Sequence, residues 1–334
     1  MVDRNPYYFS DDSRSHPLVR GQYAICTAPI LEMFDEICLW IDNHAPGGYI
    51  YGYSRFGKTW ASRFWIPKLL KEQYGKKLTF FRYEHKQHDR FSEILFLSEL
   101  LGASRHKYGR AISKKIMLDR IARLYATTAR NHGSNRIVLL IDEAQDMHDP
   151  EFQTLCNLEN ELDQHSYKLT VISVGSQELT YQHSAFIQAG QIHLMARYMV
   201  RSSRFRGICN AEELKNVLIG YDSFTEWPEK SGKSFTKYFF PKAYEDGFRM
   251  ANHANNMWRI FEELGPRKSK YSLEVPMEHI AMSVEYIFRN LTDEYVCADE
   301  LKVADLDKAI NDSNYQGHMS AISHAPNSDR RPAS

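Results

Sequence analysis

The stretch Gly52-Tyr53-Ser54-Arg55-Phe56-Gly57-Lys58-Thr59 matches the phosphate-binding loop pattern G-x-x-x-x-G-K-[ST] at every required position. Residues 47–51 predict a strand that enters this loop, and residues 60–65 predict the helix that leaves it. Glycine lets the backbone approach phosphate oxygens, and the start of the helix adds the positive end of its dipole. We therefore predict that residues 52–60, Trp60 included, bind a nucleotide, with Lys58 at its phosphates and the Thr59 hydroxyl on Mg²⁺.

A second motif follows at 137–143, where Ile137-Val138-Leu139-Leu140-Ile141 precedes Asp142-Glu143. Such an apolar run is typical of a strand buried on both faces of a parallel sheet, and ligands bind beyond the carboxyl ends of these strands. We predict that Asp142 holds Mg²⁺ and that Glu143 is the general base for an attacking water. An ordinary glycine turn or a solvated strand end explains either motif alone, but the two motifs in this order favour a nucleotide site.

The composition limits the choice of protein class. Lys+Arg and Asp+Glu both number 42, so net charge gives no overall attraction to nucleic acid or membrane. The five cysteines form no C-x-x-C pair, which favours a reducing compartment. No apolar run has the length of a membrane span, and the first residues do not resemble a secretory signal. We expect a soluble cytoplasmic protein that makes no membrane contact.

Strand and helix patterns alternate through the first two thirds of the chain, which predicts an α/β fold with a parallel sheet flanked by helices. Further strands are expected at 78–83 and 169–176. After about residue 210 the patterns are helical, at 211–220, 241–264, 276–292 and 298–311. The expected organisation is an N-terminal arm at 1–22, an ATPase core at 23–210, a smaller helical lid domain at 211–312 and a disordered tail at 313–334.

Several other side chains are candidates for the nucleotide site. Ser173 ends the strand beside the one that carries Asp142 and could orient the lytic water, although a hydroxyl that caps a strand end explains it equally well. Arg197, Arg201, Arg204 and Arg206 lie within ten residues, and an arginine from a neighbouring subunit can stabilise a transferring phosphoryl group. We choose Arg204 for that role; the alternative is a basic surface. Arg259 could close over the phosphates, or it could be an ordinary surface arginine.

Positive charge is concentrated between the second strand and the end of the next long helix. Residues of this kind contact the phosphate backbone of nucleic acid without recognising its sequence. A solvated helix face is the competing interpretation. The predicted DNA contacts are Lys86, Arg90, Arg105, Lys107, Arg110, Lys114 and Lys115.

The order of these features resembles AAA+ ATPases, and more narrowly the transposition-regulator ATPases of the TnsC/TniB type, which are related to MuB. The resemblance covers roughly residues 16–310, and the compact length is most similar to forms carried by CRISPR-associated transposons. It rests on the segments His16 to Gln22, Ile50 to Thr59, Leu140 to Met147, Val171 to Ser176 and Arg197 to Arg206. Two departures are the large residues Arg55 and Phe56 inside the loop and a Ser-Val-Gly-Ser strand end where Gly-Thr is common.

The resemblance implies that ATP-bound copies assemble as rings or helical filaments on duplex DNA and recruit a transposase and target-selection proteins. Hydrolysis would then reset the assembly. It implies that Lys58 and Thr59 bind phosphate and Mg²⁺, that Asp142 ligates Mg²⁺ and that Glu143 activates water. An AAA+ switch that acts on protein partners without DNA is the main alternative, and a small-molecule kinase with a P-loop is a third.

Overall fold

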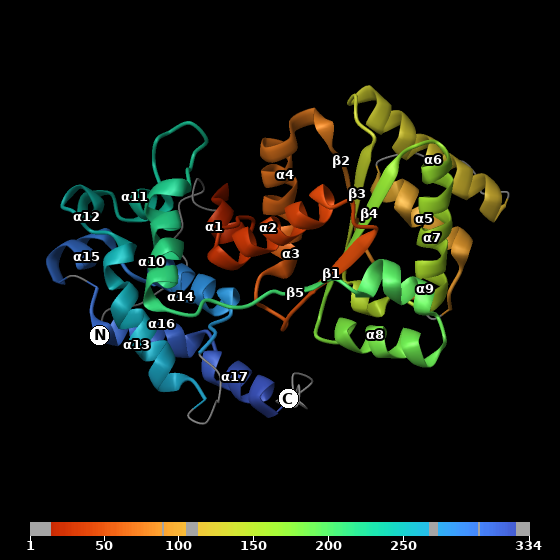
Figure 1. Ribbon diagram of the computed structural model, residues 1–334. Helices are drawn as coiled ribbons and strands as arrows, with labels where there is room; N and C mark the ends of the chain where they lie inside the picture. The colour runs from red at the N-terminus through yellow and green to blue at the C-terminus, as the bar shows by residue number, and fades with distance from the viewer. Residues whose placement is uncertain (1–14, 89, 105–112, 267–272, 300, 325–334) are drawn as a thin grey trace. The chain divides into compact units, whose positions relative to one another are not determined.

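The computed structural model describes residues 15–88, 90–104, 113–266, 273–299 and 301–324 (Figure 1). The described chain divides into two compact units. The sheet unit comprises 30–54 and 58–205, and the helical unit comprises residues up to 29, 55–57 and those from 206 onward. No helix in the described ranges is both long enough and apolar enough to cross a membrane.

The sheet unit is built on five parallel strands in the order β2-β3-β4-β1-β5. The strands are β1 (Gly47–Tyr51), β2 (Thr79–Glu84), β3 (Arg136–Asp142), β4 (Lys168–Gly175) and β5 (Ser202–Arg204). In register, Glu84 pairs with Asp142 and Tyr51 pairs with Gly175, so these strands end at one edge of the sheet. This arrangement confirms the predicted parallel α/β fold.

Helices cover both faces of this sheet, with α5, α6 and α7 on one face and α2, α3 and α4 on the other (Figure 1). The apolar sides of α5, α6 and α7 form one core with alternate residues of β3 and β4, such as Leu139 and Val171. The helices are α2 (Ala28–Asp42), α3 (Lys58–Trp60), a π-helical turn (Ala61–Trp65), α4 (Ile66–Tyr74), α5 (Glu93–Ala103), α6 (Lys114–Asn131), α7 (Asp149–Gln164), α8 (Leu179–Gln188), α9 (Ile192–Leu194) and a second π-helical turn (Met195–Met199).

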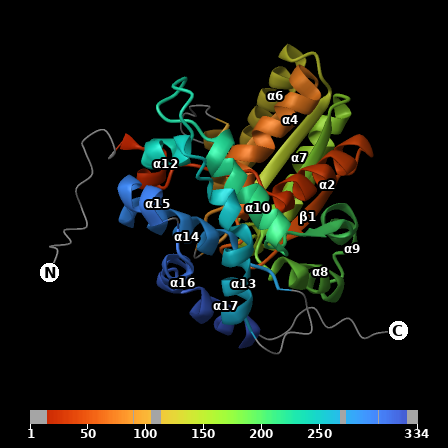
Figure 2. The same cartoon turned by 90° about the vertical axis from the view of Figure 1, so that its left-hand side faces the viewer.

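The helical unit has its own apolar core, to which α10, α13, α14 and α16 contribute (Figure 2). Its longer elements are α1 (Pro17–Arg20), α10 (Ala211–Ile219), α11 (Phe235–Phe239), α12 (Pro241–Glu245), α13 (Ala254–Leu264), α14 (Met277–Asn290), α15 (Asp293–Asp299), α16 (Val303–Asp312) and α17 (Tyr315–His324). Because this unit has a core separate from that of the sheet unit, each half of the chain buries apolar surface on its own.

Two segments differ from the expectation drawn from the sequence. The single helix expected over 241–264 is interrupted, because Gly247 adopts φ +102° and the buried Asp222 carboxylate accepts the N–H groups of Met250 and Ala251. The tail expected from 313 contains α17, whose Tyr315 and Met319 are buried in the core of the helical unit. Two apolar anchors four residues apart were too weak a periodic signal in a polar sequence.

Candidate nucleotide site

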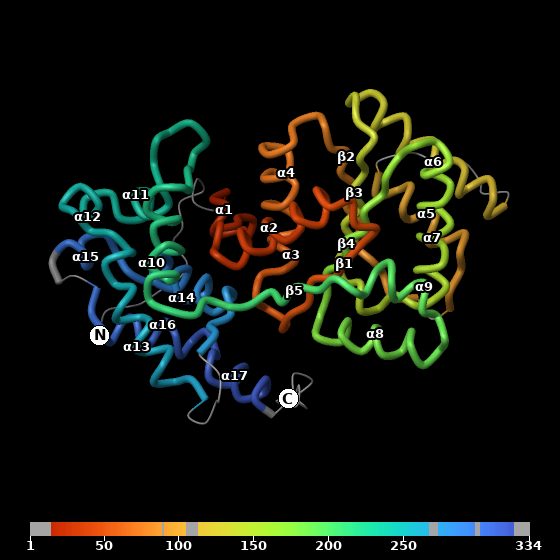
Figure 3. The backbone as a smooth tube through the Cα atoms, in the orientation of Figure 1, coloured from red at the N-terminus to blue at the C-terminus, as the bar shows by residue number. Residues whose placement is uncertain are grey.

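The loop at 52–59 joins β1 to α3, as the tube in Figure 3 traces. Gly52 lacks room for a side chain, since a Cβ atom there would lie 2.3 Å from the Phe205 carbonyl oxygen. Arg55 and Gly57 both adopt positive φ, +70° and +109°, so the loop backbone turns through left-handed conformations. Turns of this kind direct successive N–H groups toward one point, where they bind anions.

Lys58 lies at the base of this loop. Its ammonium group donates to the carbonyl oxygens of Gly52 (2.8 Å) and Tyr53 (2.7 Å). Burial lowers the pKa of Lys58 to about 8, although the nearby carboxylates of Glu143 and Asp142 act in the opposite direction. The side chain is therefore a cation at neutral pH, which donates to two carbonyl oxygens and lies near two carboxylates.

The two large loop residues that depart from the family pattern are anchored within the helical unit. The Arg55 carbonyl oxygen accepts the N–H of Glu278 (3.3 Å), and the two side chains form an ion pair at 3.6 Å. Phe56 is buried and lies against Gly207, where a Cβ atom would come within 3.0 Å of its ring. Large side chains at these positions thus hold the tip of the loop.

Asp142, at the end of β3, is 1 % exposed and is held by three donors. Its Oδ2 accepts from the Ser62 hydroxyl (2.6 Å) and from Arg82 Nη2 (2.7 Å), and its Oδ1 accepts the N–H of Glu143 (3.2 Å). Sequence analysis did not identify Ser62 or Arg82. The available signals are a serine one helical turn after Thr59 and a single cation in a strand with three aromatic residues.

Glu143 immediately follows the strand and has φ +57°, in the left-handed region. A non-glycine residue in this region carries strain of about 1–3 kcal/mol, and such residues cluster at functional sites. One carboxylate oxygen, Oε2, accepts from Gln145 Nε2 at 2.9 Å. No role for Gln145 was predicted from the sequence, although its position two residues after Glu143 was an available signal.

The donor set around Thr59 and Asp142 is compatible with Mg²⁺, which is bound in nucleotide sites by one or two carboxylates together with substrate phosphates. Thr59 is the second residue of α3, and Ser62 links this turn to Asp142, because Ser62 Oγ lies 3.0 Å from the Thr59 carbonyl oxygen and 2.6 Å from Asp142 Oδ2. Within the described ranges no group of three His, Cys, Asp or Glu side chains could hold a metal alone.

The other candidates for nucleotide contact have different surroundings. Ser173 is fully buried in β4, and its hydroxyl finds no hydrogen-bond partner in the described chain. Trp60 is 39 % exposed and stacks on Phe64 with ring centroids 5.0 Å apart. Arg259 lies on an exposed face of α13, where it forms an ion pair with Glu263 at 3.7 Å. The structure therefore places Trp60 and Arg259 on exposed surfaces and Ser173 in the interior.

Among the four clustered arginines, Arg197 and Arg206 form ion pairs within their own chain. Arg197 contacts Glu159 (3.1 Å), and Arg206 forms a bidentate pair with Glu213 (2.7 and 2.9 Å). Arg204 ends β5 opposite Tyr51, and its guanidinium lies 5.9 Å from the centre of the Tyr53 ring. Arg204 thus flanks the phosphate-binding loop of its own chain.

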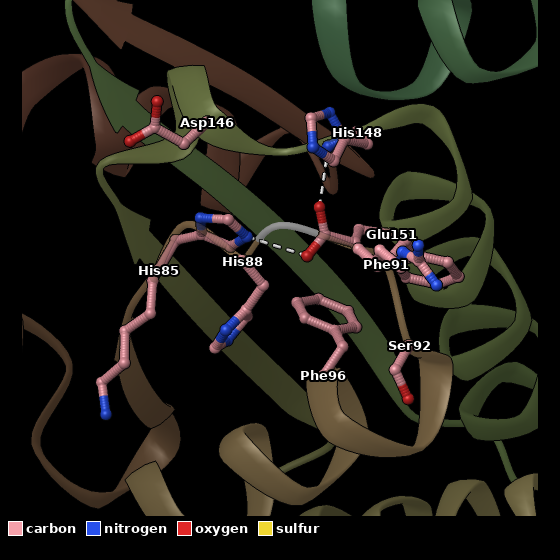
Figure 4. Close-up of a pocket in the computed structure, with 10 residues that line it drawn as sticks. His85, His88, Phe91, Ser92, Phe96, Asp146, His148 and Glu151 are labelled. Atoms are coloured by element: carbon pink, nitrogen blue, oxygen red, sulfur yellow. Dashed lines mark hydrogen bonds and ion pairs between the residues drawn. The ribbon is translucent and has the colours of Figure 1, made fainter.

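Among the predicted DNA contacts, Lys86, Arg90, Lys114 and Lys115 are exposed, whereas Arg105, Lys107 and Arg110 lie outside the described residues. Lys114 pairs with Glu93 at 3.2 Å, which brings the starts of α5 and α6 together. Lys86 and Arg90 line a small pocket that is also lined by His85 and Glu151, and His85 Nε2 lies 2.8 Å from Glu151 Oε1 (Figure 4).

Residues 41–182 match a family model described as an AAA domain. No curated protein matches the chain. Solved structures resemble it at low sequence identity, which shows a shared fold.

The Aeropyrum pernix ORC2 protein in its ADPNP–ADP complexes has a TM-score of 0.61 at 12 % identity, over 93 % of this chain and 75 % of that chain. Its ADP form has a TM-score of 0.54 at 13 % identity, over 86 % and 68 %. The Walker-type ATPase paby2304 of Pyrococcus abyssi has a TM-score of 0.50 at 11 % identity, over 87 % and 74 %. Residues 41–182 therefore match an AAA domain, and the chain has the fold of P-loop AAA+ proteins.

Proposed function

We propose that ATP-bound copies of this protein assemble as a ring or helical filament on duplex DNA and regulate transposition. In this proposal the assembly recruits a transposase and target-selection proteins in the cytoplasm, and ATP hydrolysis controls its disassembly. The proposal combines the family resemblance of the sequence with the local charge of the sheet unit. The core would correspond to 23–210, and 211–312 would be the lid domain.

One observation supports the DNA step most directly. The register of β2 and β3 pairs Glu84 with Asp142, so the chain that follows β2 leaves the sheet at the edge that carries the acidic pair. Lys86 and Arg90 lie in that segment, and the Lys114–Glu93 ion pair joins the start of α6 to the start of α5 just beyond it. A cluster of exposed cations at this edge suits phosphate contact that responds to the nucleotide.

The hydrolytic step is assigned to residues of the sheet unit. Lys58 would neutralise charge on the phosphates, and Thr59 and Asp142 would hold Mg²⁺, which supplies Lewis-acid stabilisation of the transferring group when bound. Glu143 would accept a proton from the attacking water as the water oxygen bonds to the terminal phosphorus and the bond from that phosphorus to the leaving ADP oxygen breaks. We include Ser173 and Trp60 only as neighbours of the site, and Arg259 as a lid contact.

Arg204 is proposed to act on a nucleotide held by the neighbouring copy, and a mixing experiment tests this role. Copies with Arg204→Ala keep an intact loop, and copies with Lys58→Ala keep an intact arginine. If Arg204 acts between copies, a mixture of the two inactive variants recovers ATP hydrolysis. If it serves its own loop beside Tyr53, the mixture stays inactive.

The DNA step is tested with charge variants and a matched control. Replacing Lys86, Arg90 and Lys115 together by glutamine should weaken ATP-dependent binding to duplex DNA and make its salt dependence shallower, by roughly one unit of slope per lost contact. The control replaces Lys76 and Lys77, which are exposed and precede β2, at the opposite edge of the sheet. Fluorescence anisotropy at several salt concentrations measures both sets. Equal binding by the two sets would contradict the proposed contact surface.

The nucleotide dependence is tested by electron microscopy with duplex DNA. Lys58→Ala should abolish assembly, whereas Glu143→Gln should retain ATP and stabilise the DNA-bound form. Absence of oligomers on DNA at low salt with ATP and Mg²⁺ would refute the proposal.

A switch that acts on a protein partner without DNA is the second candidate. It is favoured by exposed apolar side chains along α8 and the turns that follow it, namely Tyr181 (54 %), Ile187 (49 %), Ile192 (61 %) and Val200 (59 %). If the charge variants retain full function in transposition, this candidate replaces the first.

A further inference from the structure

Gln145 links Glu143 to the end of the neighbouring strand. Its side-chain Nε2 donates to Glu143 Oε2 at 2.9 Å, and its Oε1 accepts the backbone N–H of Ser176, directly after β4, at 3.0 Å. The same Nε2 lies 3.3 Å from Asp146 Oδ2. One amide group thus contacts both the proposed base and the strand end that adjoins it.

Gly175 provides the space that this amide occupies. A Cβ atom at Gly175 would lie 2.4 Å from Gln145 Oε1 and 3.1 Å from the Gln145 backbone nitrogen. The φ angle of Gly175 is not in the left-handed region, since it is absent from the positive-φ glycines of the described chain. Glycine is therefore required here for the approach of Gln145 and not for backbone conformation.

The short turn that carries Gln145 is fixed from the other side by α8. Gln182 Nε2 lies within hydrogen-bond distance of the carbonyl oxygens of Ala144 (3.3 Å), Gln145 (3.1 Å) and Met147 (3.0 Å). Its two hydrogens can serve two of the three at a time. The backbone at Gln145 is thus held by Gln182, and the amide group of its side chain is held by Glu143 and Ser176.

We propose that Gln145 is a positioning residue that orients the Glu143 carboxylate and transmits the position of the β4 end to it. The amide donor occupies Oε2, which fixes the plane of the carboxylate and directs it relative to the attacking water. Gln145 cannot itself take up the proton, because an amide nitrogen is a donor only. This inference rests on the proposed role of Glu143 as the general base.

Three variants separate positioning from simple folding effects. Gln145→Leu removes both hydrogen bonds, Gly175→Ala displaces the amide without removing it, and Gln188→Ala at the exposed end of α8 serves as the control. We expect the first two to lower kcat about 10- to 100-fold, part of the 10²–10⁴-fold that a positioned base contributes. Affinity for a fluorescent ADP analogue should stay within about twofold of the natural protein, because no phosphate contact is lost. The control should leave both quantities unchanged.

Two further measurements make the test specific. Gln145→Glu keeps the side-chain length and the acceptor for the Ser176 N–H but loses the amide donor to Glu143, so kcat should fall while nucleotide affinity is kept, a split that a purely structural role does not predict. The double variant Gly175→Ala/Gln145→Ala removes the 2.4 Å clash with Oε1 and leaves only the approaches to Leu179 Cδ1 (2.9 Å) and to the Gln145 backbone nitrogen (3.1 Å), so its kcat should be close to that of Gln145→Ala alone. If the losses of kcat caused by Gly175→Ala and Gln145→Ala multiplied in the double variant, the inference would be overturned.

The outcome also distinguishes failure of the inference from failure of its premise. If Glu143→Gln hydrolyses ATP normally, Glu143 is not the base, and both the base assignment and the positioning role of Gln145 are wrong. If Glu143→Gln is inactive while Gln145→Leu and Gly175→Ala keep full kcat, the base assignment stands and the positioning role of Gln145 is wrong. Should Gly175→Ala fail to fold, the Gln145 variants decide the question alone.

Discussion

Arg82 Nη2 donates a 2.7 Å hydrogen bond to Asp142 Oδ2, so the acid proposed to hold Mg²⁺ is already paired with a cation of the adjacent strand. The β2–β3 register places Arg82 opposite Leu140, and Asp142 follows two residues later on the same face of the sheet. Both side chains are largely removed from solvent. A carboxylate that is nearly inaccessible to water depends on such a partner, because an unpaired buried charge is strongly unfavourable.

Loss of Arg82 should destabilise the nucleotide-free protein. We expect Arg82→Gln to lower the free energy of unfolding by about 3–5 kcal/mol, the range for removing one partner of a buried ion pair. Added Mg²⁺ and nucleotide should recover part of this loss, because the cation supplies a new partner for Asp142 and ligand binding itself stabilises the folded state. Denaturant unfolding with and without nucleotide measures both effects.

Arg123→Gln is the matched control for that experiment. Arg123 pairs with Asp119 one helical turn away, on an exposed face of α6. Exposed pairs of this kind contribute about 0.3–0.5 kcal/mol. A loss of the same size in both variants would contradict the importance of the Arg82–Asp142 pair.

Nucleotide affinity should fall as pH rises above 8. Burial lowers the pKa of Lys58 to about 8 in the nucleotide-free protein, so the cation is lost above that pH. Phosphate favours the charged form, and binding near pH 8.5 should therefore take up a proton. Calorimetry in two buffers of different ionisation enthalpy measures this uptake, and Lys58→Arg, which stays charged, should abolish it.

The same group has the opposite effect on stability without nucleotide. Between pH 8 and the ordinary pKa of lysine near 10.5, the unfolded chain binds more protons at this position than the folded chain. The contribution of Lys58 to the free energy of unfolding therefore increases with pH in that window. A decrease assigned to Lys58 by comparison with Lys58→Met would contradict the burial argument.

Gly52→Ala should disrupt the loop more than an equivalent change at Gly75. The new methyl group would meet the Phe205 carbonyl oxygen at 2.3 Å, so backbone must move, at a cost of about 1–3 kcal/mol. At Gly75, φ is +58° but nothing lies within 4 Å of a Cβ atom, and only conformational strain remains. Titration with a fluorescent nucleotide should show weaker binding for Gly52→Ala alone.

Acid should destabilise the helical unit through His16. This side chain is buried among Phe235, Tyr238 and Phe239, with ring centroids 4.5–4.9 Å from its own, and burial lowers its pKa to about 4. The unfolded chain then binds more protons between pH 4 and 6.5, so stability present above pH 6.5 is lost as pH falls through this window.

His16→Asn tests this effect, because asparagine keeps an acceptor for the Leu18 N–H but does not titrate in this range. Its free energy of unfolding should vary less between pH 4 and 6.5 than that of the natural protein, even if its stability is lower throughout. The exposed His165→Asn serves as the control. Identical pH dependence for His16→Asn and the natural protein would show that His16 is not responsible.

The loop Gly52–Thr59 and the strand before Asp142 identified the fold because they depend on short, local patterns: glycines at fixed spacing and an unbroken apolar strand. The parallel order of the strands followed from the same alternation of elements. The helix break at Gly247 and the helix at Tyr315–His324 could not be predicted from local patterns, since each depends on contacts with the core of the helical unit.

The sequence by itself therefore determined that a P-loop and an acidic strand end occur in one α/β chain. Only the tertiary structure decided which side chains surround them. Ser62, Arg82 and Gln145 come from a helix, a neighbouring strand and a turn, and they contact Asp142 or Glu143 through hydrogen bonds of 2.6–2.9 Å. No spacing rule links residues that are 80 or 60 positions apart, because their proximity is created by strand register and helix packing.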